Sequence, residues 1–448
     1  MQAARNKPQG SSAMLELVCN RRSSDCEGNS RRDFLKVGAL GLGAVGLPQL
    51  LAARSQAASS GQPVKDTSVV WLWLGGGATH VETFDPKMDA PMEYRSTTGE
   101  VATSLPGVTF GGTFPKMAMQ AHRMAVVRSF AHSNSGHGGG THWVMTGYDH
   151  RNADNGDLPT RPGIGAIVSR VRGANHPVTG MPTYVRLGGI YGDGPAFLGT
   201  AYAPFDPGGQ AQQNMRLQVS QDRLADRRAL LRGLDRLKRE ADTSRVMEGL
   251  DQFEQQAFNL VLNKAPEAFD LNKEDPRLLD QYGNNGIGQQ MLLARRLCEA
   301  GCGFVTIHYG GWDMHGDIKR SLENLSPAMD HAVATFLEDV EQRGLSDKIL
   351  LVISGEFGRT PRVNGSAGRD HWAPLSTLAL AGGGLKMGQV VGESAPKVDV
   401  PKSTPITPLD LMATIFHVLG IDPHIQFVNP AGRPVYMLEG GSPIAELL

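Results

Sequence analysis

The sequence predicts an α/β fold with a mostly parallel central sheet that is covered by helices on both faces. Two observations lead to this prediction. Apolar runs of strand length alternate with helix-length segments along most of the chain, which is typical of a parallel sheet covered on both sides. Several of these runs end in glycine followed by charged residues, and open α/β sheets bind ligands at the carboxyl ends of their strands.

Six apolar runs are predicted to be strands of this sheet. The first, 68–74, is apolar on both faces, as a central parallel strand is when helices cover both sides. The others are 124–129, 183–187, 303–308, 350–354 and 375–381. The predicted helices of the same domain are 162–171, 288–300, 325–343 and 408–420.

Two segments have clear local signals. Thr407 is expected to cap the last helix, with Pro408 in its first turn and Gly420 at its end. The segment of about 210–285 is largely helical in pattern and rich in alternating charges, which is typical of solvated helix faces. We therefore expect it to be a helical insertion outside the sheet.

The composition narrows the class of protein. The chain has 448 residues and a formal net charge of −1 at pH 7. Proteins that bind nucleic acid by counterion release normally present a basic face, so this balance argues against a nucleic-acid partner. Glycine is frequent, with 55 residues, which indicates many turns with positive φ or close backbone approach.

The segment 1–57 is predicted to be an export signal. Arg31 and Arg32 precede a short apolar run at 37–47, and a tract of small residues follows at 55–58, with cleavage expected after Ala57. The run is too short to cross a bilayer, which favours a cleavable signal peptide over a transmembrane span. The pattern resembles a twin-arginine (Tat) signal.

This resemblance implies that the Tat export machinery is a partner and that the protein is located in the periplasm or cell envelope. We expect the mature chain, 58–448, to be one domain without a stable membrane span, since no other apolar stretch is long enough to cross a bilayer. Of its two cysteines, Cys298 and Cys302 lie four residues apart at a helix end. They are expected to be small buried apolar residues and not a disulfide or a zinc site.

Polar clusters follow four of the predicted strands, and a parallel sheet brings such strand ends to one edge. The clusters are His80, Glu82 and Asp85; His137 and His142; Asp313 and His315; and Glu356, Arg359, Asp370 and His371. For the first cluster, a solvated acidic loop is an equally good interpretation. For the last two, the alternative is that Asp313 and Glu356 cap helices while His315 and His371 are hydrogen-bonded core residues.

A divalent metal site is predicted at this edge. Asp313 and His315 are two residues apart, so in an extended segment both side chains leave the same face and can bind one ion. Mixed carboxylate and imidazole ligands suit zinc, manganese or iron better than calcium. We expect zinc first, with manganese, iron or calcium as alternatives. Arg359 is placed to clamp a phosphate or sulfate group.

Several motifs resemble those of domain-of-unknown-function family 1501, over nearly the whole mature chain. They are Gly-Trp-Asp-Met-His at 311–315, Gly-Glu-Phe-Gly-Arg-Thr-Pro at 355–361, Gly-Arg-Asp-His-Trp at 368–372 and Ala-Gly-Gly-Gly at 381–384, with shorter matches at 84–87, 145–147 and 293–297. The family consists of exported bacterial proteins and is grouped with the alkaline phosphatase and sulfatase superfamily. The resemblance therefore implies an alkaline-phosphatase-like fold.

The resemblance also implies which ligands are kept. Superfamily enzymes bind one metal with an Asp and a His from one strand end and a later His, and Asp313, His315 and His371 match these in order. The second metal site is heavily altered. Gly76 or Gly77 stands where its first Asp would be, and Glu356-Phe357 stands in place of Asp-His.

The usual nucleophile is also missing, because counting back from Thr146-Gly147 leads to His137 and not to Cys, Ser or Thr. We therefore expect an exported metal-dependent hydrolase of phosphate or sulfate esters, acting on an anionic small molecule or glycan, with His137 or His142 as base. His137 is alternatively a nucleophile or a ligand. The predicted metal ligands are Asp313, His315, Glu356 and His371, and the predicted catalytic residues are His137, His142 and Arg359. The alternative function is a degenerate superfamily member that binds metal, anion or glycan.

Overall fold

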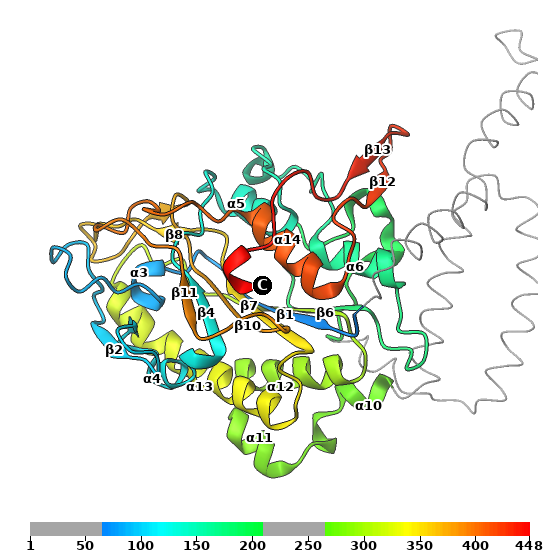
Figure 1. The fold of residues 1–448 in the computed structure, drawn as a ribbon, viewed down its shortest axis with the longest axis horizontal. Helices are drawn as coiled ribbons and strands as arrows, with labels where there is room; N and C mark the ends of the chain where they lie inside the picture. The colour runs from blue at the N-terminus through cyan, green and yellow to red at the C-terminus, as the bar shows by residue number, and fades with distance from the viewer. Residues whose placement is uncertain (1–64, 209–264) are drawn as a thin grey trace, which may run out of the picture. The chain divides into compact units, whose positions relative to one another are not determined.

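Strand β1 (Ser68–Leu74) is buried at every position and lies inside a seven-stranded sheet. It pairs in parallel with β6 (Phe304–Tyr309) on one side and with β7 (Ile349–Ser354) on the other. The computed structural model describes residues 65–208 and 265–448, which Figure 1 draws in colour. The expected signal segment and most of the expected helical insertion lie outside the described residues.

The sheet has the strand order β11-β4-β10-β7-β1-β6-β5. Its remaining strands are β4 (Met124–Val127), β5 (Tyr184–Leu187), β10 (Leu378–Gly382) and β11 (Gln389–Val391). Only β10 runs against its neighbours, β7 and β4, whereas the other pairs are parallel. The prediction of a mostly parallel sheet is therefore confirmed.

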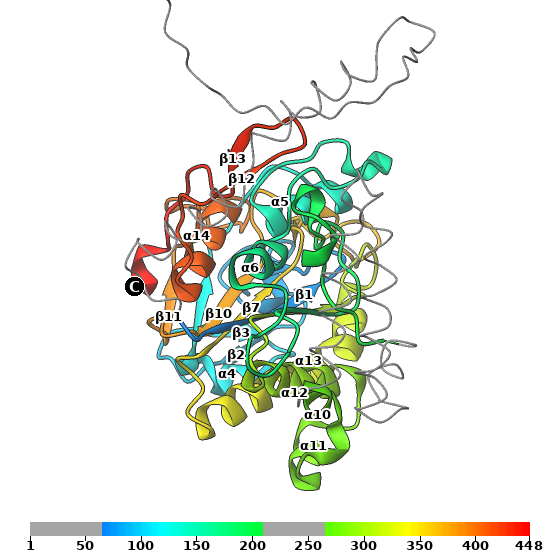
Figure 2. The same ribbon diagram turned by 90° about the vertical axis from the view of Figure 1, so that its right-hand side faces the viewer.

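Alternate side chains of β1 enter two separate apolar cores, one on each face of the sheet. Leu72 belongs to the core beneath α12 (Gly286–Glu299) and α13 (Ile318–Gln342), and Trp71 to the core beneath α6 (Ile164–Arg172) and α14 (Pro408–Leu419). Figures 1 and 2 show these helix pairs on opposite sides of the strands. A strand that is covered on both faces has no polar side, as the sequence of β1 indicated.

Short elements complete the described part of the chain. The helices are α3 (His80–Thr83), α4 (Pro115–Met119), α5 (His137–Thr146), α10 (Ala265–Phe269) and α11 (Pro276–Tyr282). Three two-stranded sheets pair β2 (Glu100–Ala102) with β3 (Thr109–Gly111), β8 (Gly358–Arg359) with β9 (His371–Trp372), and β12 (Gln426–Val428) with β13 (Pro434–Tyr436).

Most element predictions are confirmed, and the last helix is the clearest case. Thr407 accepts the amide hydrogen of Asp410 while Asp410 accepts that of Thr407, and Gly420 ends the helix with a φ of 66°. This reciprocal capping satisfies amide groups that the first helical turn leaves free. Helix α13 begins at Ile318, earlier than predicted, and continues through Pro327.

The glycine-rich segment after β4 contains a helix, because His137–Thr146 forms α5. Glycine disfavours a helix by about 1 kcal/mol relative to alanine, but here close packing requires it. A Cβ atom on Gly139 would lie 2.2 Å from the side-chain nitrogen of Asn134, and one on Gly140 would lie 2.9 Å from the carbonyl oxygen of Glu356. The helix can therefore lie directly against the end of β7.

Two further expectations concern the surface and the cysteines. Cys298 and Cys302 are both buried and both free thiols, as predicted. Burial raises the pKa of Cys302 to about 12, so this thiol is inert at neutral pH. Within residues 65–208 and 265–448, none of the helices combines the length and the apolar character that crossing a bilayer requires.

Candidate metal centre

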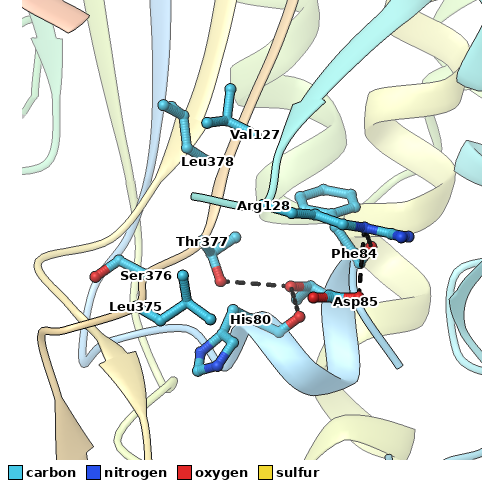
Figure 3. Close-up of a pocket in the computed structure, with 10 residues that line it drawn as sticks. His80, Phe84, Asp85, Val127, Arg128, Leu375, Ser376, Thr377 and Leu378 are labelled. Carbon is cyan, nitrogen blue, oxygen red and sulfur yellow. Dashed lines mark hydrogen bonds and ion pairs between the residues drawn. The ribbon is translucent and has the colours of Figure 1, made fainter. Parts of the chain in front are cut away.

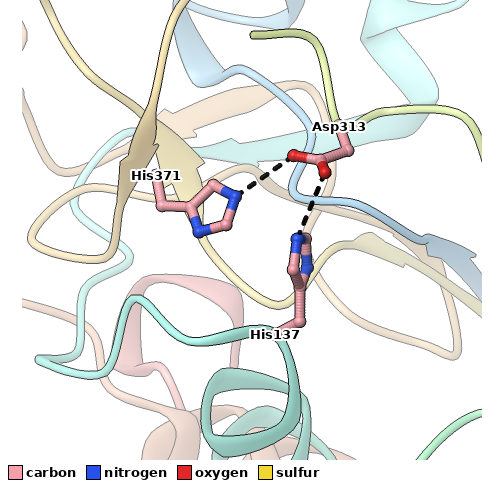
Figure 4. A group of neighbouring side chains, drawn as sticks. All are labelled: His137, Asp313 and His371. Carbon is pink, nitrogen blue, oxygen red and sulfur yellow. Dashed lines mark hydrogen bonds and ion pairs between the residues drawn. The ribbon is translucent and has the colours of Figure 1, made fainter. Parts of the chain in front are cut away.

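Four side chains from three segments meet at the carboxyl edge of the sheet. Asp313 and His315 follow β6, His137 is the first residue of α5, and His371 begins β9. Figure 4 shows the carboxylate of Asp313 in contact with the rings of both His137 and His371. We call these four residues the Asp313 cluster. Their side chains are between 24% and 48% exposed, so a ligand can reach them.

The polar atoms of the cluster lie close together. Asp313 Oδ1 is 2.9 Å from His315 Nε2 and 3.1 Å from His371 Nε2, and these two nitrogens are 3.1 Å apart. The other carboxylate oxygen, Oδ2, is 3.4 Å from His137 Nε2. One ligand atom each from His137, Asp313 and His371 also lies within 4.8 Å of the others. Asp313 Oδ1, His315 Nε2 and His371 Nε2 therefore form a tight triangle of possible metal-ligand atoms. His137 Nε2 is a fourth possible ligand atom beside this triangle.

Each imidazole of the cluster turns its Nδ1 atom toward an acceptor behind it. His371 Nδ1 lies 2.9 Å from the carbonyl oxygen of Ser135, and His315 Nδ1 lies 2.7 Å from Asp370 Oδ1. His137 Nδ1 lies 2.8 Å from Glu356 Oε1. Since each Nδ1–H donates to these oxygens, each neutral ring presents a bare lone pair at Nε2.

The lone pairs converge with the carboxylate of Asp313, so acceptors face one another with no hydrogen atom to share. A cation between them removes this repulsion, and metal-ligating histidines characteristically donate their other ring nitrogen in this way. Zinc–nitrogen distances of about 2.0–2.1 Å in tetrahedral geometry correspond to ligand atoms about 3.3–3.4 Å apart. The separations of 2.9–3.4 Å fit a small divalent ion.

The electrostatics of the cluster favour an ionised Asp313 carboxylate and a neutral His371 ring. Partial burial raises the pKa of Asp313, but the hydrogen bond and the positive charge of Arg359 outweigh burial and hold that pKa well below its ordinary value. Burial lowers the pKa of His371 below 6.5. The hydrogen bond to Glu356 instead raises the pKa of His137, which makes His137 the more basic of these two rings.

Arg359 does not have the exposure that an anion clamp needs. Its side chain is fully buried and donates to the carbonyl oxygens of Gly76, Gly77 and Arg369 and to Asp313 Oδ1, the last at 2.5 Å. With these donors engaged, the guanidinium cannot reach a ligand. The expectation that Arg359 clamps a phosphate or sulfate is corrected: it fixes the orientation of Asp313.

Glu356 supports the cluster from behind and is not one of its converging donors. It is 3% exposed, and its Oε1 accepts the amide hydrogen of Gly76 at 2.8 Å together with His137 Nδ1–H. Its Oε2 has no hydrogen-bond partner within the described residues. The structure thus places His137, the predicted alternative, at the cluster, with Glu356 holding its ring.

His142 does not join the cluster, which corrects its predicted role as a base there. It lies five residues after His137 on α5, about 140° further round the helix. Its ring is fully buried, with Nδ1 2.8 Å from the carbonyl oxygen of Tyr148 and Nε2 accepting from the amide of Arg161 at 3.4 Å. Both ring nitrogens have backbone partners, so the role of His142 is structural.

The strand-end cluster after β1 is buried and paired, and neither of its predicted interpretations, a ligand site or a solvated loop, is correct. Glu82 is fully buried and accepts from Arg369 at 2.8 Å, and Asp85 forms an ion pair with Arg128. His80 Nε2 lies 2.9 Å from the carbonyl oxygen of Val398. Figure 3 shows His80, Asp85 and Arg128 around a cavity of ≈ 10 Å³, about the volume of one water probe.

The altered second metal site is physically filled. A Cβ atom on Gly76 would lie 2.4 Å from the backbone nitrogen of Asp313, and one on Gly77 would lie 2.2 Å from the ring of Phe357. That ring packs against His371, with centroids 4.4 Å apart, and against His137 at 5.1 Å. An aspartate at position 76 or 77 has no room, so Phe357 takes the space beside the cluster.

Sequence reasoning gave no role to two residues that orient the cluster. Asp370 directly precedes His371 in the sequence, and this adjacency to a predicted ligand is the signal that could have identified it as a partner of His315. Ser135 acts through its backbone carbonyl, which no side-chain pattern reveals. Such orienting groups behind metal ligands typically change affinity by about 10–100-fold when removed.

The fold and the site define an α/β protein with a mostly parallel sheet and a candidate His/Asp metal centre at the carboxyl edge of that sheet. The chain belongs to the family described as "Protein of unknown function (DUF1501)", whose model matches residues 66–448. The predicted family membership is confirmed. Among curated proteins, no sequence matches the chain.

Solved structures similar to this chain include a sulfatase, a phosphonate monoester hydrolase and an alkaline phosphatase. PsFucS1 sulfatase from Pseudoalteromonas sp. is 12% identical with a TM-score of 0.39, over 85% of this chain and 73% of that chain. The phosphonate monoester hydrolase SpPMH from Silicibacter pomeroyi is 12% identical with a TM-score of 0.34, over 80% and 74%. TAB5 alkaline phosphatase, in a mutant with Mg bound, is 12% identical with a TM-score of 0.34, over 81% and 99%.

Proposed function

We propose that this protein hydrolyses phosphate or sulfate esters with one divalent metal ion bound at the Asp313 cluster. The observation that supports this most directly is the set of three imidazoles whose Nδ1 atoms are engaged behind them and whose Nε2 atoms converge on one carboxylate. Such a set of bare acceptors needs a cation, and its exposure leaves the cation open to a substrate.

The tight triangle of Asp313, His315 and His371 is assigned to the ion, because its three ligand atoms are 2.9–3.1 Å apart. Arg359 and Asp370 fix the orientation of Asp313 and His315 through hydrogen bonds. A bound divalent ion supplies Lewis-acid activation of water or of an ester oxygen.

His137 is assigned the role of general base. Its Nε2 lies beside Asp313 Oδ2, outside the tight triangle, and its ring is 42% exposed. It accepts a proton from the attacking water at Nε2, while the Glu356 carboxylate stabilises the resulting imidazolium through Nδ1–H. Its raised pKa suits this task.

Metal content tests the centre. The mature chain, purified without chelator, is expected to contain about one equivalent of metal per chain by mass spectrometry. His315→Ala should fall below half an equivalent, while His424→Ala, which removes an exposed histidine paired with Asp422, should keep the metal. Less than about half an equivalent in the parent, unchanged by His315→Ala, would overturn the metal assignment.

His137→Gln separates the base from the ligands. Metal content is expected to stay near one equivalent while turnover falls by about 10²–10⁴-fold, the usual contribution of a general base. If His137→Gln loses the metal and His315→Ala keeps it, the ion is held by the wider group of His137, Asp313 and His371, and the assigned roles are reversed.

A panel of aryl sulfates, phosphomonoesters and phosphodiesters tests the reaction class. We expect metal-dependent release of the aryl alcohol from at least one of them, lost on chelation and restored by the metal. Absence of metal-dependent turnover on all of them would favour the alternative function, in which the centre binds an anion or glycan without chemistry.

Export by the Tat pathway is part of the proposal and is supported by residues 30–57. Arg31 and Arg32 precede the apolar run 37–47, and a small-residue tract with the expected cleavage position after Ala57 follows at 55–58. Fractionation of cells should find the chain in the periplasm or cell envelope, and the double variant Arg31→Lys, Arg32→Lys should accumulate in the cytoplasm. Unchanged export of that variant would contradict a twin-arginine signal.

A further inference from the structure

Carboxylates surround the Asp313 cluster. Besides Asp313 itself, Glu356 contacts His137 and Asp370 contacts His315, each through a ring nitrogen. A fourth carboxylate, Asp154, lies at the start of α5, where its Oδ1 accepts the amide hydrogen of Gly138 at 2.6 Å and its Oδ2 that of Gly139 at 3.2 Å. Each of these groups is one hydrogen bond from a cluster residue or from the residue beside it.

The positive charge that is paired with the cluster is buried. Within residues 65–208 and 265–448, Arg359 is the lysine or arginine that forms an ion pair with a cluster side chain. It is fully buried, and its donors are engaged by Asp313 and by backbone carbonyls. The guanidinium of Arg359 is therefore not available to bind a substrate anion at the cluster.

The backbone amides of the three glycines near the start of α5 are also engaged. Gly138 and Gly139 donate to Asp154, and Gly140 donates to the carbonyl oxygen of Gly136 at 2.8 Å. The start of a helix often binds phosphate through such amides. Here the carboxylate of Asp154 already takes the amides of Gly138 and Gly139 and opposes a second anion.

Formal charges show the consequence. The carboxylates of Asp313, Glu356, Asp370 and Asp154 contribute four negative charges and Arg359 one positive charge, which leaves a formal charge of −3. A divalent ion brings this to −1. Because like charges repel and unlike charges attract at these short distances, each additional negative charge on a substrate weakens its binding.

We propose that the centre prefers monoanionic esters, namely sulfate esters and phosphodiesters, over dianionic phosphomonoesters. The preference rests on the proposed function and specifies its substrate class. In the reaction, the oxygen of water forms a new bond to sulfur or phosphorus and the bond to the ester oxygen breaks. One proton of the water passes to His137, and the ester oxygen departs with the bonding electron pair as an alkoxide or phenolate that solvent protonates.

Three substrates with the same leaving group test the preference on the metal-loaded mature chain at pH 8. They are p-nitrophenyl phosphate, a dianion; its methyl ester, a monoanion; and p-nitrophenyl sulfate, a monoanion. We expect kcat/KM at least about tenfold higher for one of the monoanions than for the dianion. The methyl ester and the sulfate distinguish a phosphodiesterase from a sulfatase.

Asp154→Asn tests whether charge causes the preference. Asparagine keeps an oxygen that can accept from Gly138 but removes the negative charge. The ratio of kcat/KM for the dianion to that for the preferred monoanion should rise about threefold or more, with metal content unchanged. Asp422→Asn, a matched change at an exposed carboxylate that contacts His424, should leave the ratio unchanged.

The outcomes are separable. Turnover in which the parent prefers the dianion, or an unchanged ratio in Asp154→Asn, overturns the charge preference but leaves the proposed function intact. Absence of metal-dependent turnover on all three substrates overturns both. A monoanion preference that Asp154→Asn reduces supports both.

Discussion

Two polar clusters at the same edge of the sheet have similar residues and opposite properties. The Glu82 cluster, His80, Glu82 and Asp85, follows β1, and the Asp313 cluster draws on the segments after β4, β6 and β7. The first is between 0% and 4% exposed, and Glu82 is balanced by Arg369. The second is partly exposed and directs bare imidazole nitrogens at a carboxylate.

This difference shows what distinguishes a ligand site from a structural network. Both clusters contain histidine and acid after a parallel strand, so residue type and position do not separate them. A buried polar group needs a hydrogen-bond or ion-pair partner inside the protein. Converging acceptors that solvent can reach can instead be satisfied by a bound cation. Four predictions test this contrast, in order of decreasing effect.

Glu82→Gln should destabilise the protein without affecting the metal. The change leaves the fully buried Arg369 without a counter-charge, and removal of one partner of a buried ion pair costs about 3–5 kcal/mol. Urea unfolding should show this loss, with one equivalent of metal retained by the folded protein. A metal content that falls with stability would mean that the Glu82 cluster belongs to the site.

His132→Gln should reduce the loss of folding stability that the protein shows as pH falls. Burial lowers the pKa of His132 to about 4, although its contact with the Glu356 carbonyl opposes this. Between pH 6.5 and 4 the unfolded chain binds a proton that the folded protein does not, so folding stability falls as pH falls.

For His132 this loss amounts to about 2 kcal/mol between pH 7 and pH 5. Urea unfolding of the metal-free parent and variant at both pH values should show the difference. Other histidines with burial-lowered pKa values, including His80 and His371, should leave a residual slope. Identical slopes in parent and variant would contradict the assignment to His132.

Glu356→Gln is the matched counterpart of Glu82→Gln and should have the opposite result. It weakens the hold on His137 and should raise the metal dissociation constant or reduce turnover by about 10–100-fold, as loss of an orienting carboxylate does. Stability should change by less than about 1 kcal/mol, since no buried cation loses its partner. Competition with a chromophoric chelator and urea unfolding measure the two quantities.

His424→Ala should have the smallest effect. The ring is 82% exposed, and within the described residues the acid that forms an ion pair with it is Asp422. Exposed substitutions away from special features change stability by less than about 0.5 kcal/mol. Metal content and turnover equal to the parent would show that loss of a histidine alone does not disturb the centre.

Much of the fold was predictable because each element has its own local signal. The run 68–74 is apolar on both faces, and the Thr407 cap with Gly420 bounds a helix at residues that the structure reproduces. Helix α5 was not predictable in this way. Its glycines argue against a helix, and only packing against Asn134 and the end of β7 explains them.

The sequence by itself determined the family, the α/β class and the set of strand ends from which a site could be built. Only the tertiary structure decided that His137, Asp313, His315 and His371 converge while His80, Glu82 and His142 find structural partners. The physical reason is that strand and helix patterns depend on neighbours along the chain. Whether a polar group is paired depends on backbone carbonyls and charged side chains from distant segments. Examples are the carbonyl of Ser135 behind His371 and the guanidinium of Arg369 beside Glu82.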